Sequence, residues 1–344
     1  MKSRILELDA LRGIASISVV VFHFMMGRTV FGYSFKYGLM GVDMFFMISG
    51  FVIFLTLSNT KNWKDFIVSR FSRLYPTYWT CVTFTFLLQT LYYLHNGTFT
   101  NPMIGKYVVN LTMFQHYPGI KDLDPQYWTM IVEMNFYIIM LLIFRFTLIH
   151  KMETIGIGIV LFALFNDFYL WYIFPSLTKV LNFCIPLLNF FPLFLSGVLF
   201  YKLKFDKQTV LRYFFLAICF TAEVLIFNVS KASPLFITAA EYAMVLLVFF
   251  IVFFLYTLNL LKFIVNRLTI FLGSISYSLY LIHQNLGNVF IIPKAEKYLG
   301  FPVSFFIALI TSILIAYLIT RFIEQPALRF IRKKYKQHKA RVTN

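Results

Sequence analysis

Long apolar runs, separated by short polar segments, recur from one end of this chain to the other. Each run holds roughly 17 to 25 mostly hydrophobic residues, enough for a helix to cross the ~30 Å hydrocarbon core of a membrane. The pattern predicts an all-α integral membrane protein, a bundle of about ten transmembrane helices. The expected spans lie roughly at 8–27, 38–58, 75–95, 126–148, 154–174, 184–203, 209–229, 234–258, 268–292 and 301–323.

Composition agrees with this class. The chain is 60% hydrophobic and 13% charged, includes 44 Phe, and has a mean hydropathy of +0.76. Such values are typical of membrane proteins and leave no room for a separate soluble domain. We expect one transmembrane domain over residues 1–324 and a basic cytoplasmic tail over residues 325–344. The first run lacks a small-residue cleavage site, so we expect a retained span and not a signal peptide.

The formal net charge of +17 is also found in proteins that bind nucleic acid, but its distribution indicates a membrane. If the N-terminus is cytoplasmic, the inner segments and their helix ends hold 23 of the 31 Lys and Arg, and the outer ones hold 8. This asymmetry is the positive-inside rule, and it predicts that both termini are cytoplasmic. The basic tail is then expected on the anionic lipids of the inner leaflet, and we expect no nucleic-acid partner.

Two other features carry less information. Cys81, Cys184 and Cys219 all fall in apolar spans without metal-ligand spacing, which predicts packing residues and no metal site. The outer loop from about 96 to 125 is long for a tight bundle. It is either a binding or lid element that dips into the membrane, or a variable surface loop.

Arg12 and His23 are the most informative pair. In a helix, eleven residues advance by ~1100°, about 20° past three full turns, so the two side chains share one face and lie about 16 Å apart along the axis. His23 is the only ionisable group in the run 14–26. An ionisable residue in a membrane span is costly, and it usually faces an interior cavity. His23 is therefore a functional candidate, and the alternative is a hydrogen-bonded packing residue.

Other ionisable groups form two layers once the spans are oriented. Asp43, Glu133 and His283 fall, like His23, in the outer half of the membrane. Asp43 has the alternative role of a helix cap or a structural partner. Glu133 has the alternative of pairing with a buried Arg or His, and for His283 we favour a hydrogen bond to a neighbouring helix.

The second layer is basic and cytoplasmic. Arg70 and Arg73 in FIVSRFSRLYPTYW have the i, i+3 spacing that places both on one helix face. Forked guanidinium groups bind phosphates bidentately, which suits a soluble anionic donor that arrives from the cytoplasm. The alternative is that both residues only obey the positive-inside rule.

Six segments together resemble the acyltransferase-3 family, multi-span bacterial membrane proteins that acylate surface sugars and related hydroxyl acceptors. They occur in the family's order from residue 8 to 329 and are LDALRGIASISVVVFHF, GVDMFFMISGF, SRFSRLYPTYW, YWTMIVEMNFY, LGSISYSLYLIH and IEQPALR. The resemblance implies a location in the bacterial inner membrane.

The resemblance also implies roles. Arg12 and His23 match the family's Arg-ten-His element, in which His23 is the catalytic residue. Arg70 and Arg73 match its Arg-x-x-Arg element, which holds acyl-CoA phosphates, and Glu133 matches the acidic residue of a Trp-Ser-x-x-Glu-like segment. This chain departs from the pattern at Glu133-Met134-Asn135, where many members read Glu-Glu-Gln, and at Thr129, which follows the tryptophan.

We therefore expect an O-acyltransferase, with acetyl-CoA or another acyl-CoA as donor substrate and no tightly bound cofactor. The phosphates would dock at Arg70, Arg73 and Arg12. His23 would act as general base or carry the acyl group itself, supported by Glu133 or Asp43. The acceptor would be a hydroxyl of a surface or lipid-linked glycan.

Two rival classes remain open. A secondary transporter or flippase of lipid-linked sugars also has intramembrane charges, which would couple to ions. A non-catalytic scaffold or sensor would keep the bundle but leave the polar layer unexplained. Release of free CoA from an acyl-CoA would distinguish an acyltransferase from both of these classes.

Overall fold

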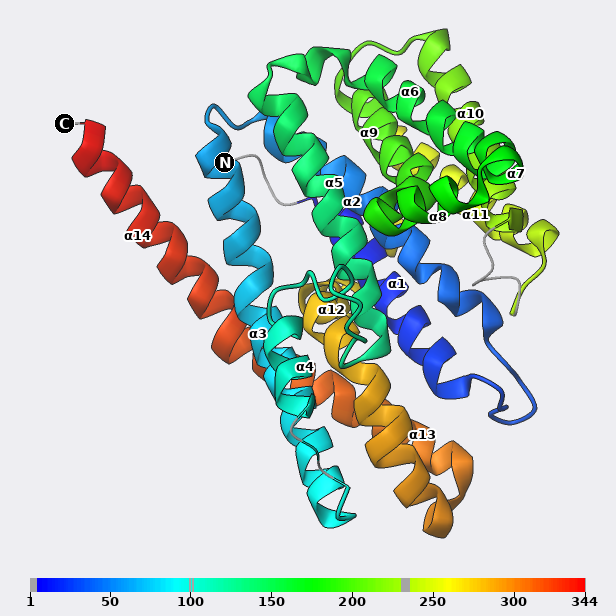
Figure 1. Cartoon of the computed structure of the whole chain (residues 1–344), viewed down its shortest axis with the longest axis vertical. Helices are drawn as coiled ribbons and strands as arrows, with labels where there is room; N and C mark the ends of the chain where they lie inside the picture. The colour runs from blue at the N-terminus through cyan, green and yellow to red at the C-terminus, as the bar shows by residue number, and fades with distance from the viewer. Residues whose placement is uncertain (1–4, 99, 101, 230–235, 344) are drawn as a thin grey trace. The chain divides into compact units, whose positions relative to one another are not determined.

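The computed structural model describes residues 5–98, 100, 102–229 and 236–343. Residues 234 and 235, where one expected span begins, and residues 99 and 101 of the long loop lie outside the described residues. The described chain is helical, and its bridge between Val30 and Tyr33 is isolated. The helices of Figure 1 are α1 (Leu6–Met25), α2 (Gly41–Ser58), α3 (Trp63–His95), α4 (Pro102–Asn110), α5 (Trp128–Arg145), α6 (Met152–Leu164), α7 (Trp171–Ile173), α8 (Pro175–Cys184), α9 (Phe191–Phe205), α10 (Val210–Val229), α11 (Ala239–Thr257), α12 (Arg267–Asn285), α13 (Ile292–Ile319) and α14 (Gln325–Thr343).

Eight helical stretches among the described residues are long and apolar enough to cross a membrane. They are Leu6–Met25, Lys36–Ser58, Pro125–Arg145, Leu148–Ile173, Pro186–Phe205, Val210–Asn228, Ala239–Thr257 and Arg267–Arg341. The last is 75 residues long and includes both expected spans 268–292 and 301–323, with a left-handed backbone at Gly300 (φ 74°) between them. The expected span 75–95 lies in the 33-residue helix α3, which is not among the eight. The all-helical membrane class is confirmed, while the count of ten and the cytoplasmic termini stay predictions.

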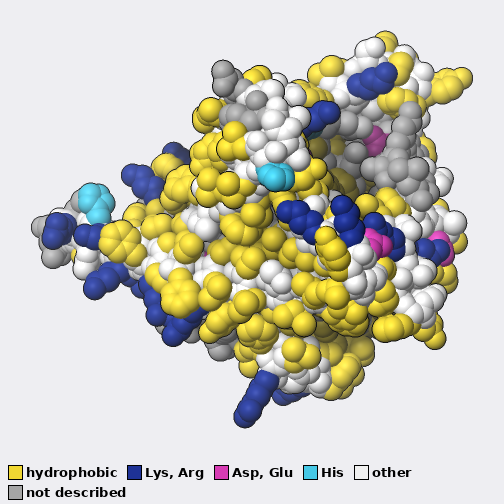
Figure 2. Space-filling model, turned by 90° about the horizontal axis from the view of Figure 1, so that it is seen from below, with side chains coloured by type: hydrophobic (Ala, Val, Ile, Leu, Met, Phe, Trp, Pro, Cys, Tyr) yellow, Lys and Arg dark blue, Asp and Glu magenta, His cyan; other side chains and the backbone are white. Residues whose placement is uncertain are grey.

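Large apolar side chains face outward on the helices, as they do where a protein meets lipid. Figure 2 shows hydrophobic side chains over most of the visible face. Leu161, Val180, Phe214 and Met244 are all at least half exposed. These surfaces and the apolar stretches describe a multi-pass membrane protein.

The chain divides into two compact units. The first unit comprises residues 1–19, 36–59 and 130–273, and the second comprises 20–35, 60–129 and 274–344. Helices α1, α5 and α12 each have a part in both units.

In the first unit, α9 is the central helix. Its apolar stretch is 83% buried, against 22% for the stretch that contains α6 and for α11. Helix α2 lies along α9, and both helices use glycine at the contact. A Cβ on Gly197 would lie 2.0 Å from the carbonyl oxygen of Met47, and one on Gly50 would lie 2.0 Å from that of Phe194. The backbones can approach this closely only because neither residue has a side chain.

The second unit combines α3, α4, α13 and α14 with the ends of α1 and α12. Helix α14 contacts the first half of α3, where Asp65 accepts hydrogen bonds from Tyr335 (2.8 Å) and Lys339 (2.8 Å). The expected basic tail is thus a helix in contact with α3 over part of its length. Of the cysteines, Cys81 and Cys219 are buried, whereas Cys184 is exposed.

The glycine contact gives a first prediction. Gly197→Ala places a methyl group against the Met47 carbonyl, and we expect a loss of about 1–3 kcal/mol in the free energy of unfolding, because the packed backbones must separate. Gly158→Ala on α6 is the matched control, since a Cβ there meets nothing within 4 Å. Thermal unfolding in detergent should show a lower midpoint for Gly197→Ala only; equal midpoints for both variants would contradict this account.

Candidate functional site

A pair of histidines joins two helices of the second unit. The Nδ1 atom of His23, near the end of α1, lies 2.8 Å from Nε2 of His283 on α12. The ring centroids are 5.0 Å apart. His283 is fully buried, whereas His23 is only partly buried. The pair therefore has one fully buried side chain and one that keeps part of its surface exposed.

Hydrogen-bond partners fix the proton positions of the neutral pair. Nδ1 of His283 lies 2.8 Å from the carbonyl oxygen of Tyr280, and a carbonyl can only accept, so this nitrogen carries the proton. Nε2 of His283 is then the acceptor, and it takes its hydrogen bond from Nδ1–H of His23. The remaining nitrogen, Nε2 of His23, keeps its lone pair.

The local backbone allows the two rings to meet. Gly287, just after α12, leaves room for the ring of Phe24. A Cβ at this position would lie 2.1 Å from that ring. Nδ2 of Asn288 donates to the His23 carbonyl oxygen at 3.0 Å. Both residues belong to a π-helical segment, Leu286–Ile291. Such segments are rare in proteins, and those that occur often lie at functional sites.

Polar residues just before α5 and in its first turn contact α12. Nε2 of Gln126 donates to the Leu281 carbonyl at 3.0 Å. The Tyr280 hydroxyl donates to the Gln126 carbonyl (3.1 Å) and lies 3.0 Å from the Thr129 hydroxyl. These contacts hold the stretch of α12 that carries His283. The contact between Thr129 and Tyr280 could not be predicted from the position of Thr129 after the tryptophan.

Asp124 lies at the end of the long loop, before the α5 span. It is fully buried and accepts a hydrogen bond from the backbone nitrogen of Asn285 (3.3 Å). Burial raises the pKa of Asp124 to about 8, even though the hydrogen bonds from Asn285 and Gln126 act to lower it. The carboxyl group is therefore protonated in the folded protein near neutral pH.

An arginine site also lies in the second unit. Nη1 of Arg73 donates to Glu324, which is buried at the end of the π-helical segment Thr320–Glu324. Glu324 also accepts from the Ser278 hydroxyl on α12 at 3.2 Å. The Arg70 guanidinium lies 5.9 Å from the Phe66 ring. The sequence motif predicted Arg70 and Arg73, but it did not reveal that Glu324 neutralises part of their charge.

Helix α12 connects the arginine site to the histidine pair. Ser278 contacts Glu324, and His283, five residues later, contacts His23. Five residues of α-helix rise about 7.5 Å. The two sites are thus at different depths on the same helix.

The remaining predicted residues lie in the first unit. Arg12 pairs with Asp9 on α1 (3.5 Å). Glu133 accepts hydrogen bonds from the Ser49 hydroxyl (2.8 Å) and from the Tyr137 hydroxyl.

Asp43 also lies in the first unit, where it is buried. It interacts electrostatically with the buried Glu223, which accepts from the Tyr242 hydroxyl at 3.1 Å. The structure brings Glu133 to Ser49 and Asp43 to Glu223, and the predicted support of His23 by Glu133 or Asp43 stays a prediction.

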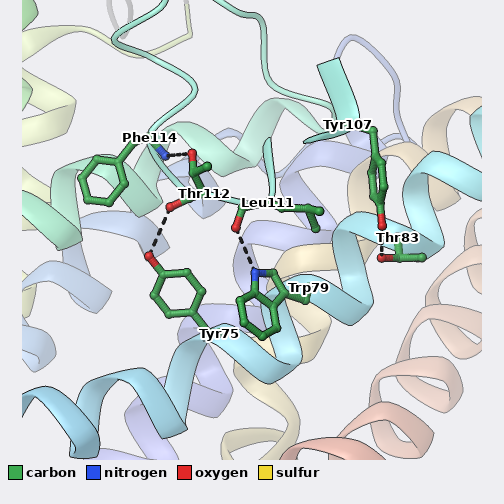
Figure 3. Close-up of a pocket in the computed structure, with 7 residues that line it drawn as sticks. All are labelled: Tyr75, Trp79, Thr83, Tyr107, Leu111, Thr112 and Phe114. Atoms are coloured by element: carbon green, nitrogen blue, oxygen red, sulfur yellow. Dashed lines mark hydrogen bonds between the residues drawn. The ribbon is translucent and has the colours of Figure 1, made fainter. Parts of the chain in front are cut away.

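The long outer loop folds back along α3. The Trp79 indole donates to the Leu111 carbonyl (2.9 Å), and the Tyr75 hydroxyl donates to the Thr112 carbonyl (3.1 Å). Together these segments line a cavity of about 620 Å³, whose lining residues are Tyr75, Trp79, Thr83, Tyr107, Leu111, Thr112 and Phe114 (Figure 3). The loop therefore contacts the part of α3 that was expected to span the membrane, and both expected roles of the loop stay predictions.

Comparison with known proteins identifies the family. The sequence profile of the acyltransferase domain of the acyltransferase-3 family matches residues 5–321. The chain belongs to this family.

The acyltransferase also resembles a viral protein. A protein of Acidianus two-tailed virus, named "Putative acetyltransferase ORF330", is 27% identical over 299 residues, which cover 79% of the acyltransferase and 80% of the viral protein. No solved structure matches the chain. The family and this relative support a transferase of acyl groups.

The buried carboxyl group of Asp124 gives a pH prediction. Because its folded-state pKa is raised from 3.8 to about 8, the group contributes stability that is fully present below pH ~4 and is lost as the pH rises through about 8. The thermal midpoint of the detergent-solubilised acyltransferase should therefore fall as the pH rises toward about 8, and Asp124→Asn should show a smaller fall.

The control for this measurement is Asp206→Asn, because Asp206 is exposed and pairs with Arg212. This variant should decline between pH 5 and 8 as the wild type does. An unchanged slope for Asp124→Asn would show that Asp124 does not titrate in that interval.

Proposed function

We propose that the protein is an O-acyltransferase of the bacterial inner membrane. It moves an acyl group, acetyl foremost, from cytoplasmic acyl-CoA to a hydroxyl of a surface or lipid-linked glycan. The observation that supports this proposal best is the His23–His283 pair, because its hydrogen bonds leave a lone pair on the partly buried His23.

In the proposed step, Nε2 of His23 removes the proton of the acceptor hydroxyl as its oxygen attacks the thioester carbonyl carbon. The C–O bond forms, the C–S bond breaks, and the CoA sulfur leaves with the electron pair. The imidazolium of His23 then returns the proton to that sulfur, so the products are the ester and free CoA. A general base of this kind is typically worth about 10²–10⁴ in rate.

His283 acts as a positioning residue in this proposal. It accepts the Nδ1 proton of His23 and so keeps the reactive nitrogen unprotonated, the role that a carboxylate often has beside a histidine. Glu133 and Asp43 are the further candidates to stabilise the imidazolium charge.

The donor would bind through its phosphates at Arg70 and Arg73, with Arg12 as a third candidate. Guanidinium groups form bidentate, charge-assisted hydrogen bonds with phosphate. Glu324 would keep Arg73 oriented until the donor arrives. The thioester arm would then extend along α12 toward the histidines.

The central test replaces His23. Membranes that carry wild type or His23→Ala receive acyl-labelled acetyl-CoA and a crude glycan acceptor. We expect transfer to fall by about 10²–10⁴-fold, with the variant still inserted in the membrane. His150→Ala is the matched control, since His150 is exposed on the turn Leu148–Lys151. Equal transfer by His23→Ala would remove His23 from the chemistry, and no CoA release by any protein would favour a transporter.

A second prediction separates positioning from structure. His283→Gln keeps an oxygen that accepts the His23 proton, whereas His283→Leu does not. We expect His283→Leu to lower kcat with little change in the KM for acyl-CoA, and His283→Gln to restore much of the rate. If both variants lose activity equally and both unfold at lower temperature, the role of His283 is only structural.

A further inference from the structure

A third arginine lies against the predicted Arg-x-x-Arg element. Nε of Arg332 on α14 donates to the Ser72 hydroxyl at 3.2 Å, and its Nη2 lies 3.4 Å from both the carbonyl and the hydroxyl oxygen of Ser69. Nη2 of Arg70 donates to the same Ser69 hydroxyl at 3.2 Å. Two guanidinium groups, 262 residues apart in the chain, therefore converge on one oxygen atom.

This arrangement is electrostatically unfavourable by itself. Arg332 is close enough to Arg70 and Arg73 for their positive charges to repel it. Like charges so close together destabilise a fold unless an anion compensates them. Glu324 pairs with Arg73 and offsets part of this positive charge. The geometry is that of a site for an anion with more than one charge.

The neighbouring contacts hold Arg332 in place. Three and seven residues beyond it on α14, Tyr335 and Lys339 bind Asp65 at the beginning of α3. Contacts on both sides of Ser69 thus fix α14 against α3. A guanidinium that is held in advance loses less entropy when it binds a ligand.

We propose that Arg332 completes a phosphate-binding site with Arg70 and Arg73, and that this site takes the adenosine-phosphate end of the acyl-CoA donor. This inference rests on the proposed function for the identity of the donor. Its chemistry is the recognition of two or more phosphate groups by three forked guanidinium groups.

The position of Arg332 agrees with this role. Ser69, which it contacts, precedes Arg73 by four residues on α3, a rise of about 6 Å. Arg73 is joined through Glu324 to Ser278, and the histidine pair lies about 7.5 Å further along α12. Arg332 is thus at the end of the arginine site farther from His23, where the phosphates of a donor with a long arm would lie.

The test measures binding of adenosine 3′,5′-bisphosphate, the polyanionic end of CoA, to the full protein in nanodiscs of phosphatidylcholine. Arg332→Gln removes charge-assisted hydrogen bonds, so we expect binding to be about 10- to 100-fold weaker. The matched control is Arg329→Gln, because Arg329 is exposed one turn earlier on α14 and lies 3.5 Å from Gln325. It should bind as the wild type does. Equal binding by Arg332→Gln, or equal losses in both variants, would overturn the inference.

Two further measurements identify the anion and distinguish loss of the binding site from misfolding of the variant. Arg332→Lys keeps the charge but not the fork, and it should bind with intermediate affinity if the protein is folded. Nanodiscs with phosphatidylglycerol test the other source of phosphate. If that lipid abolishes the difference between wild type and Arg332→Gln, the site binds a lipid headgroup and the assignment to the donor is wrong.

Kinetics then separates this inference from the proposed function. Arg332→Gln should raise the KM for acetyl-CoA but not for acetyl-pantetheine, which lacks the phosphates. An unchanged KM for acetyl-CoA would overturn the inference while acyl transfer stands. Binding of the bisphosphate that depends on Arg332, without acyl transfer from acetyl-CoA by the wild type, would overturn the proposed donor and leave the phosphate site.

Discussion

The polar face of α12 has to find its hydrogen-bond partners inside the protein, because no water is available in the hydrocarbon region and each unsatisfied group costs several kcal/mol. This constraint organises the second unit. Five of its polar groups each bind a different partner: Tyr277 binds the Leu74 carbonyl, Ser278 binds Glu324, Tyr280 binds Gln126, His283 binds His23 and Asn285 binds Leu123. One helix thereby collects α1, α3, the end of α13 and the segment before α5.

The same helix explains how one unit can hold two different kinds of chemistry. Near its middle, Ser278 helps to hold an acid that neutralises an arginine, and near its end His283 holds an imidazole in one tautomer. In the proposed function, the first environment would bind an anion and the second would supply a neutral base. Because the two are separated along one rigid helix, neither must reorganise to accommodate the other.

Sequence reasoning worked where the signal is local. Hydropathy over a window of about 20 residues predicted the membrane class, because a span must be apolar along its whole length. The i, i+3 spacing of Arg70 and Arg73, and the isolation of His23 in an apolar run, are also local signals, and the roles that they indicate stay predictions. The sequence predicts that His283 lies in the same outer layer as His23 and forms a hydrogen bond to a neighbouring helix, but it does not identify the partner.

The missed features are those that depend on packing between distant segments. His23 and His283 are 260 residues apart, and no periodicity relates them. Glu324 belongs to the segment IEQPALR. The signal in the sequence that points to it is an acidic residue at the end of a span, in a chain with only 14 Asp and Glu. Arg332 looked like one more charge of a basic tail, since nothing in the tail's sequence shows that it contacts α3.

The π-helical segments at Leu286–Ile291 and Thr320–Glu324 have a consequence for the spacing of the chain. A π-helical turn accommodates more residues than an α-helical turn, so it changes the direction in which every later side chain points. One segment begins three residues after His283, and the other ends at Glu324. Because each residue of an α-helix turns the chain by about 100°, adding or removing a single residue in the helix between Gly300 and Glu324 would rotate Glu324 away from Arg73. The number of residues between Gly300 and Glu324 is therefore as much a part of the arginine site as the Glu324 side chain itself.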